Sequence, residues 1–306
     1  MQPVYIRFGG YQPPTSVHNQ AAVALGRGLA ARLGPAVSFE LDGNIIASGH
    51  QAADLLAMVE SGAMTMCYFS ASYLAARVPE FALLDLPFTI NDRKRAYAIL
   101  DGRFGRLLQE KLREATGFRL LNFWDNGFRH LTNTIHPIRM PLDCLGLRIR
   151  TLFSDLHRQV FASLGFKPVA LDVKDLMAGV QSGAIEAQEN PLTNTYNFGI
   201  HRYHRHITLS SHFFGAAVVL CHQASYMTWP HEVRQAVEAA VSEATAVQRQ
   251  LAAAEDDNVL AKLRLTRNEI VHLMDSERAK FVEAVAPVRE QQQQIFGNHL
   301  FSYLEP

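Results

Sequence analysis

Short apolar runs alternate along this chain with segments in which apolar residues recur every three to four positions. Runs of the first kind predict buried strands, and the second spacing predicts helices with one buried face. Residues 4–8 (VYIRF) illustrate the strand pattern. The helix pattern follows Ser16, a good N-cap, and places Ala22, Leu25, Leu29 and Leu33 on one face. Alternation of this kind predicts an α/β protein.

The same pattern continues to the C-terminus. We expect strands at residues 37–41, 63–68, 118–123, 147–151, 169–171 and 184–188. We expect helices at residues 52–60, about 92–113, 155–164, 175–181, 230 to about 265, and 275 to about 294. The helix that starts near residue 230 is long for a globular protein.

Two ten-residue segments resemble each other, which suggests two related lobes. Residues 54–63 read DLLAMVESGA and residues 175–184 read DLMAGVQSGA. Each predicts a helix, a glycine stop and a strand, and each strand leads to polar or aromatic residues: YFS at 68–70 and QEN at 188–190. Ligands of open α/β sheets bind at the carboxyl ends of strands, so we expect a cleft where two such ends face each other. Generic alternation of helices and strands is the alternative interpretation.

Composition narrows the possible functions. The chain has 306 residues, of which 48% are apolar, with 29 basic and 29 acidic side chains. This balance gives no overall field that would attract nucleic acid. No apolar run reaches the roughly 18 residues of a membrane span, so we expect no direct membrane insertion. Cys67, Cys144 and Cys221 are widely spaced, and we expect Cys67 and Cys221 to pack as small core residues.

Two arginines are the strongest candidates for binding chemistry. Arg150 lies in GLRIRT at 146–151, a predicted strand, and Arg129 lies in NGFRHLTN at 126–133. A guanidinium between apolar strand neighbours needs an anionic partner, because an unpaired buried charge is very costly. For Arg150 that partner is either a ligand carboxylate or an internal acid, Asp143 or Glu186. For Arg129 the alternative is an exposed loop position after the turn signal Asn126-Gly127.

Several motifs in this order resemble the substrate-binding proteins of TRAP transporters (tripartite ATP-independent periplasmic transporters), including those that bind C4-dicarboxylates. The motifs are DLPF at 85–88, NGFRHLTN at 126–133, PLDCLG at 141–146 followed by Arg150, and QENP at 188–191. The resemblance covers nearly the whole chain. One departure lies at residues 31–35, where ARLGP replaces the usual turn of the family.

The resemblance implies a fold, a function and a location. The fold would be a two-lobe, Venus-flytrap type of periplasmic binding protein, with a mainly parallel sheet in each lobe and a long helix spanning both. Lobe I would be residues 1–123 plus about 210–250, and lobe II residues 124–209 plus about 251–306. The protein would capture a small organic acid in the periplasm and deliver it to the membrane subunits of a transporter. No recognisable signal peptide precedes residue 4, which by itself would favour the cytoplasm.

The resemblance also implies roles for individual residues. Arg150 would clamp the ligand carboxylate, Arg129 would be a second donor, and Asn190 would contact the ligand through its amide. Neither a catalytic residue nor a cofactor nor a metal is expected. The alternative is an enzyme acting on organic acids, with a general acid or base beside Arg150.

Further candidates for ligand contacts are polar or aromatic residues near the predicted strand ends: Tyr11, His18, Asn44, Phe69, Ser70, Trp124, Phe128 and Phe213. The aromatic residues suggest a ligand with an aromatic or apolar tail. The alternatives are that most of them are core residues, and that the ligand is a sugar acid or a C4-dicarboxylate.

Two other patterns are weaker. Residues 26–31 (GRGLAA) fit the letters of a dinucleotide fingerprint, but they lie inside a predicted helix and not at a strand-to-helix turn. His201, His204 and His206 cluster among arginines, where a metal ion would meet repulsion. We therefore interpret the histidine cluster as a polar surface loop.

Overall fold

The computed structural model of the protein describes residues 3–304, and its internal contacts divide the chain into two units. Unit 1 comprises the chain up to Ser70, Leu107–Asp125 and Ala216–Glu255. Unit 2 comprises Ala71–Arg106, Asn126–Gly215 and the chain from Asp256 onward. Residues 71–106 thus group with unit 2, whereas the sequence-based division placed them in lobe I. The predicted cleft stays a prediction.

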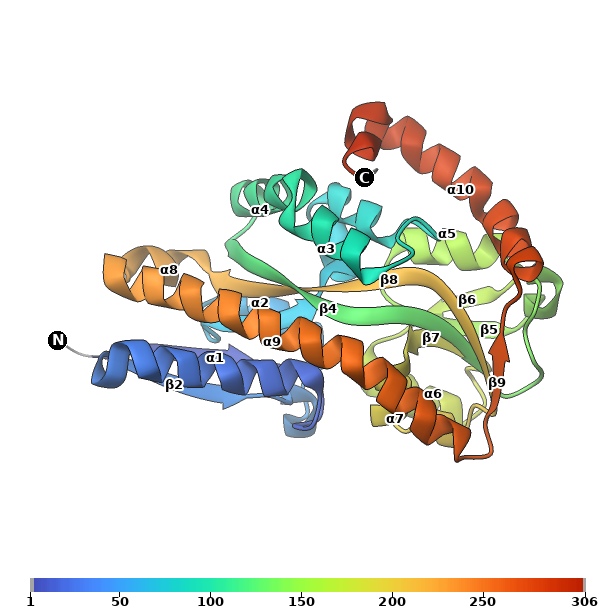
Figure 1. Ribbon diagram of the computed structural model, residues 1–306, viewed down its shortest axis with the longest axis horizontal. Coiled ribbons are helices and arrows are strands. Elements are labelled where there is room, and N and C mark those ends of the chain that lie inside the picture. Colours follow the sequence, from blue (N-terminus) through green and yellow to red (C-terminus); the bar gives the residue numbers. More distant parts are fainter. Residues whose placement is uncertain (1–2, 305–306) are drawn as a thin grey trace. The chain divides into compact units, whose positions relative to one another are not determined.

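Three long elements contribute residues to both units: β4 (Phe118–Asn133), β8 (His206–His222) and α9 (His231–Arg264) (Figure 1). The helix expected from residue 230 to about 265 is therefore confirmed. The chain is α/β, as the alternating pattern predicts. The sheet is mixed: most of its strands have a parallel neighbour, as expected, but β8 and β4 each pair antiparallel with one.

In unit 1, β1 (Val4–Gly9) pairs in parallel with both β2 (Val37–Asp42) and β3 (Met66–Ser70), and β3 pairs antiparallel with β8. The helices of this unit are α1 (Val17–Leu33), α2 (Asp54–Glu60), α8 (Gln223–Thr228), most of α4 (Arg103–Ala115) and the first part of α9. Ser16 caps α1 by accepting a hydrogen bond from the Asn19 amide, and Ala22, Leu25 and Leu29 are fully buried, as the spacing predicts. Leu33 is only half-buried.

In unit 2, the last part of β4 pairs antiparallel with β7 (Ala187–Pro191), which pairs in parallel with β5 (Arg148–Thr151). Strand β5 also pairs in parallel with β6 (Lys167–Ala170), and β8 with β9 (Glu269–His272). The helices are α3 (Arg93–Asp101), α5 (Asp155–Ser163), α6 (Val173–Gln181), α7 (Leu192–Asn197) and α10 (Asp275–Ser302). Helices α5 and α10 lie side by side (Figure 1) and share one apolar core that includes Val160, Phe161, Phe281 and Val285.

Some predicted elements need correction. The single helix expected at residues 92–113 is two helices, α3 and α4, separated at Gly102. The backbone leaves the helix at Gly102, which is extended (φ −87°, ψ −154°), and a Cβ there would meet the Ala98 carbonyl oxygen at 2.4 Å, so the position requires glycine. The strand expected at 118–123 continues to Asn133, and β8 was not predicted. The turn signal Asn126-Gly127 lies inside β4, where Gly127 adopts a φ of 91°.

Several expectations about burial are met. Cys67 and Cys221 are buried core residues, and so is Cys144. Within residues 3–304, no helix combines the length and the apolar character that crossing a membrane requires.

The prediction that His201, His204 and His206 form a polar surface loop is wrong for two of the three, because His204 and His206 are buried. The Thr132 hydroxyl lies 2.8 Å from Nδ1 of His204.

Candidate functional site

Strands β5 and β7 place the strongest candidates of unit 2 next to each other. The two strands are parallel, with Arg150 opposite Gln188, so Arg150 and Asn190 lie near the carboxyl ends of neighbouring strands. Side chains at these ends are the ones that α/β sheets use for ligands. Both are buried, with relative exposures of 1% for Arg150 and 4% for Asn190.

Within residues 3–304, Arg150 is a buried cation without an acidic partner. Its Nε donates to the Leu171 carbonyl oxygen at 2.8 Å, while its Nη2 has no hydrogen-bond partner among the described residues. Neither acid considered from the sequence neutralises it. Glu186 pairs with Arg148 at 3.0 Å, and Asp143 accepts hydrogen bonds from the amides of Arg139 and Met140. A guanidinium buried in this way needs an anion.

Tyr73 lies close to this guanidinium. Burial raises the pKa of the Tyr73 hydroxyl, and the positive charge of Arg150 acts in the opposite direction. The ring of Tyr73 meets the half-exposed ring of Phe153 edge to face, with centroids 6.4 Å apart. The phenol therefore stays protonated at neutral pH and offers a hydrogen-bond donor beside the charge.

Arg129 has a different environment from Arg150. It is only 2% exposed, so the exposed-loop alternative is wrong. Its Nε and Nη2 both donate to the Glu189 carboxylate, Nη2 to Oε1 at 2.7 Å, and Nη2 also reaches the Glu189 carbonyl oxygen at 2.9 Å. Two of the three guanidinium nitrogens that were expected to donate to a ligand therefore donate to Glu189. The role of Arg129 as a ligand donor stays a prediction.

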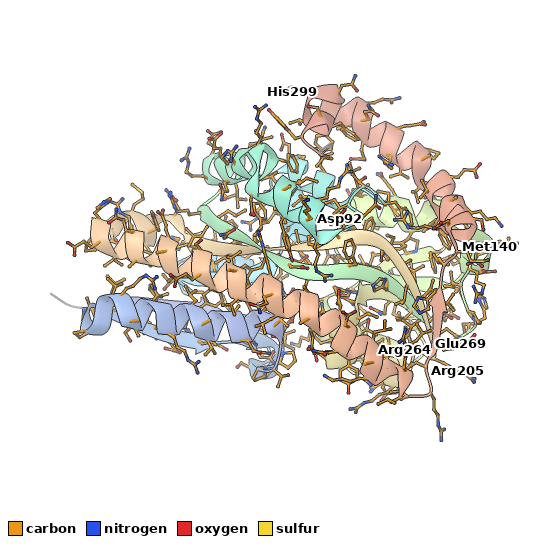
Figure 2. All side chains as sticks on the ribbon, viewed as in Figure 1. Asp92, Met140, Arg205, Arg264, Glu269 and His299 are labelled. Atoms are coloured by element: carbon orange, nitrogen blue, oxygen red, sulfur yellow. The ribbon has the colours of Figure 1, made fainter. Side chains whose placement is uncertain are left out.

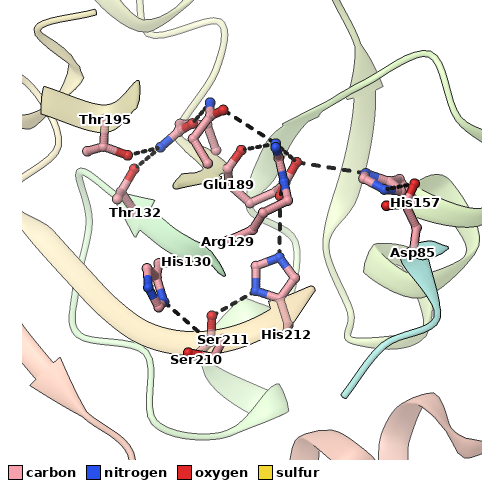
Figure 3. A network of polar contacts seen from close by, with 12 residues as sticks. Asp85, Arg129, His130, Thr132, His157, Glu189, Thr195, Ser210, Ser211 and His212 are labelled. Atoms are coloured by element: carbon pink, nitrogen blue, oxygen red, sulfur yellow. Dashed lines mark hydrogen bonds and ion pairs between the residues drawn. The ribbon is translucent and has the colours of Figure 1, made fainter. Parts of the chain in front are cut away.

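Glu189 is the centre of a buried polar network that the sequence did not reveal (Figure 3). Besides Arg129, its carboxylate lies 3.4 Å from Nε2 of His212 and 3.8 Å from Nδ1 of His157. On the other side of its ring, His157 lies 3.1 Å from Asp85. Burial would raise the pKa of Glu189, but the charge of Arg129 and the hydrogen bonds from His212 and Arg129 hold it well below its usual range. Glu189 is therefore ionised and Arg129 is compensated.

Asn190 is held by its neighbours on β7 and β4. Its Nδ2 donates to Gln188 Oε1 at 2.5 Å, and its Oδ1 lies 3.4 Å from Arg129 Nη2. Gln188 in turn donates to the Thr132 hydroxyl at 2.6 Å. This chain fixes the orientation of the Asn190 amide next to the strand that carries Arg150. Its contact with a ligand stays a prediction.

The other two candidates of unit 2 are aromatic and pack against neighbouring side chains. Phe213 is buried, and its ring stacks on His157 with centroids 4.5 Å apart. Phe128 is half-buried, meets Phe214 edge to face, and lies under the Arg93 guanidinium. The alternative interpretation as core residues therefore describes Phe213 better than Phe128.

The remaining candidates belong to unit 1, and four of them lie at or just after the carboxyl ends of β1, β2 and β3. Tyr11 and Asn44 form a β-bridge, and Phe69 and Ser70 end β3. The ring of Tyr11 packs on Phe69 with centroids 5.3 Å apart. The hydroxyl of Tyr68 accepts hydrogen bonds from the amides of Tyr11 and Gln12, which fixes the loop after β1.

Several polar atoms of this region are buried without a partner among the described residues. They are Nε2 of Gln12, Nδ1 of His18 and Oδ1 of Asn44. Burial lowers the pKa of His18 to about 3, so its ring is neutral at physiological pH. Gln12 was not a candidate, because only its place after β1 distinguishes it from other glutamines. Unsatisfied buried polar atoms require an explanation, and a polar ligand is one.

Trp124 lies in the aromatic core of unit 1. It is fully buried, stacks with Phe8 and Tyr68, and donates from its indole nitrogen to the Thr245 hydroxyl at 3.0 Å. The ring of His18 lies 6.1 Å from that of Trp124 and stacks on Tyr68 at 4.9 Å. The indole hydrogen is thus already used inside the unit, and a ligand contact for Trp124 stays a prediction.

Comparison with known proteins identifies the class. The model of a family described as bacterial extracellular solute-binding protein, family 7, matches residues 8–294. The chain is 27% identical over 231 residues to the 2,3-diketo-L-gulonate-binding periplasmic protein YiaO of Escherichia coli, covering 76% of this chain and 70% of that protein.

Two solved structures share the fold over almost their entire length. A sugar acid binding protein of Advenella mimigardefordensis, in complex with galactonate, has a TM-score of 0.95 at 25% identity and covers 100% of this chain and 98% of that one. A TRAP periplasmic solute binding protein of Sulfurospirillum deleyianum, with bound succinate, has a TM-score of 0.93 at 25% identity and covers 99% of each chain. The chain therefore belongs to family 7 of the bacterial extracellular solute-binding proteins, the periplasmic binding proteins of TRAP transporters. This confirms the family that the motifs predicted.

Proposed function

We propose that Arg150 is the residue by which this binding protein captures the carboxylate of a small organic acid. The observation that carries the proposal is the state of Arg150: buried, with a free Nη2 and no acidic partner within residues 3–304. A ligand carboxylate supplies the missing charge, and the planar guanidinium suits two parallel hydrogen bonds to it. The captured acid is then delivered to the membrane subunits of a TRAP transporter.

For the ligand class, we propose a hydroxylated acid over one with an aromatic tail. Trp124 and Phe213, two of the aromatic candidates, each pack inside an apolar core of their own unit, which argues against an aromatic tail. The relative that binds 2,3-diketo-L-gulonate and the structure with galactonate agree with this choice. A sugar acid is therefore our proposed ligand class, with C4-dicarboxylates next.

A thermal-shift screen over sugar acids, dicarboxylates, keto acids and aryl acids tests both the proposed ligand class and the role of Arg150. For the best ligand, we expect Arg150→Ala to weaken binding about 10²- to 10⁴-fold, since two charged hydrogen bonds contribute about 1.5–3 kcal/mol each. Arg148→Ala is the matched control, because Arg148 lies on the same strand but pairs with Glu186 on the surface. Unchanged affinity in Arg150→Ala would refute the assigned carboxylate clamp.

Incubation of the wild type and of Arg150→Ala with the best ligand from this screen distinguishes binding from catalysis. We propose reversible, stoichiometric capture, and mass spectrometry after prolonged incubation would then recover the acid unchanged. Conversion of the acid by the wild type but not by Arg150→Ala would favour the enzyme instead.

A further inference from the structure

A second cationic region of unit 2 has no role in the carboxylate site. It is a surface pocket of about 510 Å³ between the loop that precedes β8 and the turn that follows α9. Its lining is His201, Arg202, Tyr203, Arg205, Thr266, Arg267 and Asn268. Figure 2 labels Arg205, Arg264 and Glu269 at this end of α9, and the carbonyl oxygen of Arg205 accepts a hydrogen bond from the Glu269 amide at 2.8 Å.

The walls of the pocket are held in place by hydrogen bonds. The side-chain amide of Asn268 donates to the carbonyl oxygens of His201 and His204, each at 2.8 Å, and so ties the two segments together. Gln181 donates to the hydroxyl of Tyr203 at 2.9 Å, and the ring of His201 stacks on Tyr196 at 4.5 Å. These contacts hold in place the two backbone segments that carry the arginines.

The three arginines of the pocket are uncompensated. Among the described residues, Arg202, Arg205 and Arg267 form no ion pair and no side-chain hydrogen bond, and all three are exposed. The nearest acid in the sequence, Glu269, lies against Nδ1 of His206 at 3.1 Å.

Several surface arginines elsewhere in unit 2 do have acidic partners. Arg158 is paired with Asp155 at 2.5 Å, Arg139 with Glu277 at 3.3 Å, and Arg148 with Glu186 at 3.0 Å. The chain as a whole has no net charge, so the concentration of positive charge in this pocket is local.

We propose that this pocket is an accessory site for a phosphate group. The guanidinium groups of Arg202, Arg205 and Arg267 offer several donors to the multiple oxygens of a phosphate, whereas Thr266 and Asn268 use their donors to hold the loop. The anion could be free, as inorganic or organic phosphate, or part of an anionic phospholipid headgroup. Leu265, which is 89% exposed at the edge of the same turn, distinguishes these sources, because only a lipid surface would contact it.

The experiment measures binding of inorganic phosphate and glycerol phosphate by calorimetry, and of phosphatidylglycerol vesicles by sedimentation, with phosphatidylcholine vesicles as the neutral reference. We expect the full chain to bind at least one of the phosphate probes, and Arg205→Ala/Arg267→Ala to weaken that binding at least tenfold. Loss of affinity for the soluble probes assigns a free phosphate. Loss for vesicles, with a further weakening by Leu265→Ser, assigns a lipid headgroup.

The control is Arg27→Ala/Arg158→Ala, which removes the same charge from other exposed positions. An equal loss of phosphate affinity in both double variants would show that only the net charge of the protein matters, and would overturn the proposed site. Absence of binding to every phosphate probe would overturn it too. Arg150→Ala should still bind the phosphate probe, and the pocket variant should still bind the organic acid, so the two proposals fail separately.

Discussion

Two buried arginines of unit 2 show how local partners decide what a guanidinium can do. Arg129 is engaged by Glu189, whereas Nη2 of Arg150 has no protein partner among the described residues. Both arginines could be chosen from the sequence, through the family motifs. Their different states could not, because Glu189 lies 60 residues from Arg129 and next to several other polar residues. Asp85, His157 and His212 join the same network from three further segments, and no spacing in the sequence relates them.

The Arg129–Glu189 pair gives a prediction at this scale. Glu189→Gln keeps the shape of the side chain but leaves the buried guanidinium without its charge partner. We expect a loss of about 3–5 kcal/mol in the free energy of unfolding, measured by urea denaturation. The control is Glu186→Gln, which breaks the more exposed pair with Arg148 and should lose less than about 1 kcal/mol. If Glu189→Gln and Glu186→Gln lost the same free energy of unfolding, burial would not be the reason why the Arg129–Glu189 pair stabilises the fold.

At the scale of elements, periodicity predicts helices well and long strands poorly. The helices α1, α5, α6 and α9 follow their apolar spacing closely. In contrast, the strand predicted at residues 118–123 covers only the first part of β4, and β8 was not predicted. Strands usually have five or six residues, but these have 16 and 17. A Cβ at Gly215 on β8 would meet the Gly127 carbonyl oxygen on β4 at 3.0 Å. The Asn126-Gly127 pair therefore lies where β4 and β8 approach each other closely, and it does not form the turn that this dipeptide usually indicates.

The two related segments supply a matched prediction about helix ends. Helices α2 and α6 are each followed by a glycine with positive φ, 78° at Gly62 and 73° at Gly183. Gly183→Ala meets no atom within 4 Å, so we expect only the conformational strain of about 1–2 kcal/mol.

Gly62→Ala also brings its Cβ to 3.0 Å from the ring of His222, and should lose more stability unless that ring moves. Thermal denaturation of both variants checks the order. A larger loss at Gly183 would contradict this account of the two helix ends.

At the scale of the molecule, buried neutral histidines link stability to pH. Burial lowers the pKa of His18 and His130 to about 3 and that of His204 to about 4, from 6.5. Below pH 6.5 the unfolded chain takes up protons that the folded chain does not, so acid favours unfolding. Glu189, whose folded pKa is depressed, adds to the loss once the pH falls below its ordinary value of 4.5.

We therefore expect the free energy of unfolding to be greatest above pH 6.5 and to fall between pH 6.5 and 4. Each histidine contributes a slope of up to about 1.4 kcal/mol per pH unit. Urea denaturation across this range measures the slope, and His18→Gln should reduce it by one histidine's share. A free energy that stays constant from pH 7 to pH 4.5 would show that these rings protonate without unfolding.

The position of the aromatic residues has an optical consequence. The chain has two tryptophans, Trp124 and Trp229, and both belong to unit 1. Intrinsic tryptophan emission therefore originates in one half of the molecule, while circular dichroism senses the helices of both. Melting curves recorded with the two signals will coincide only when the halves unfold together.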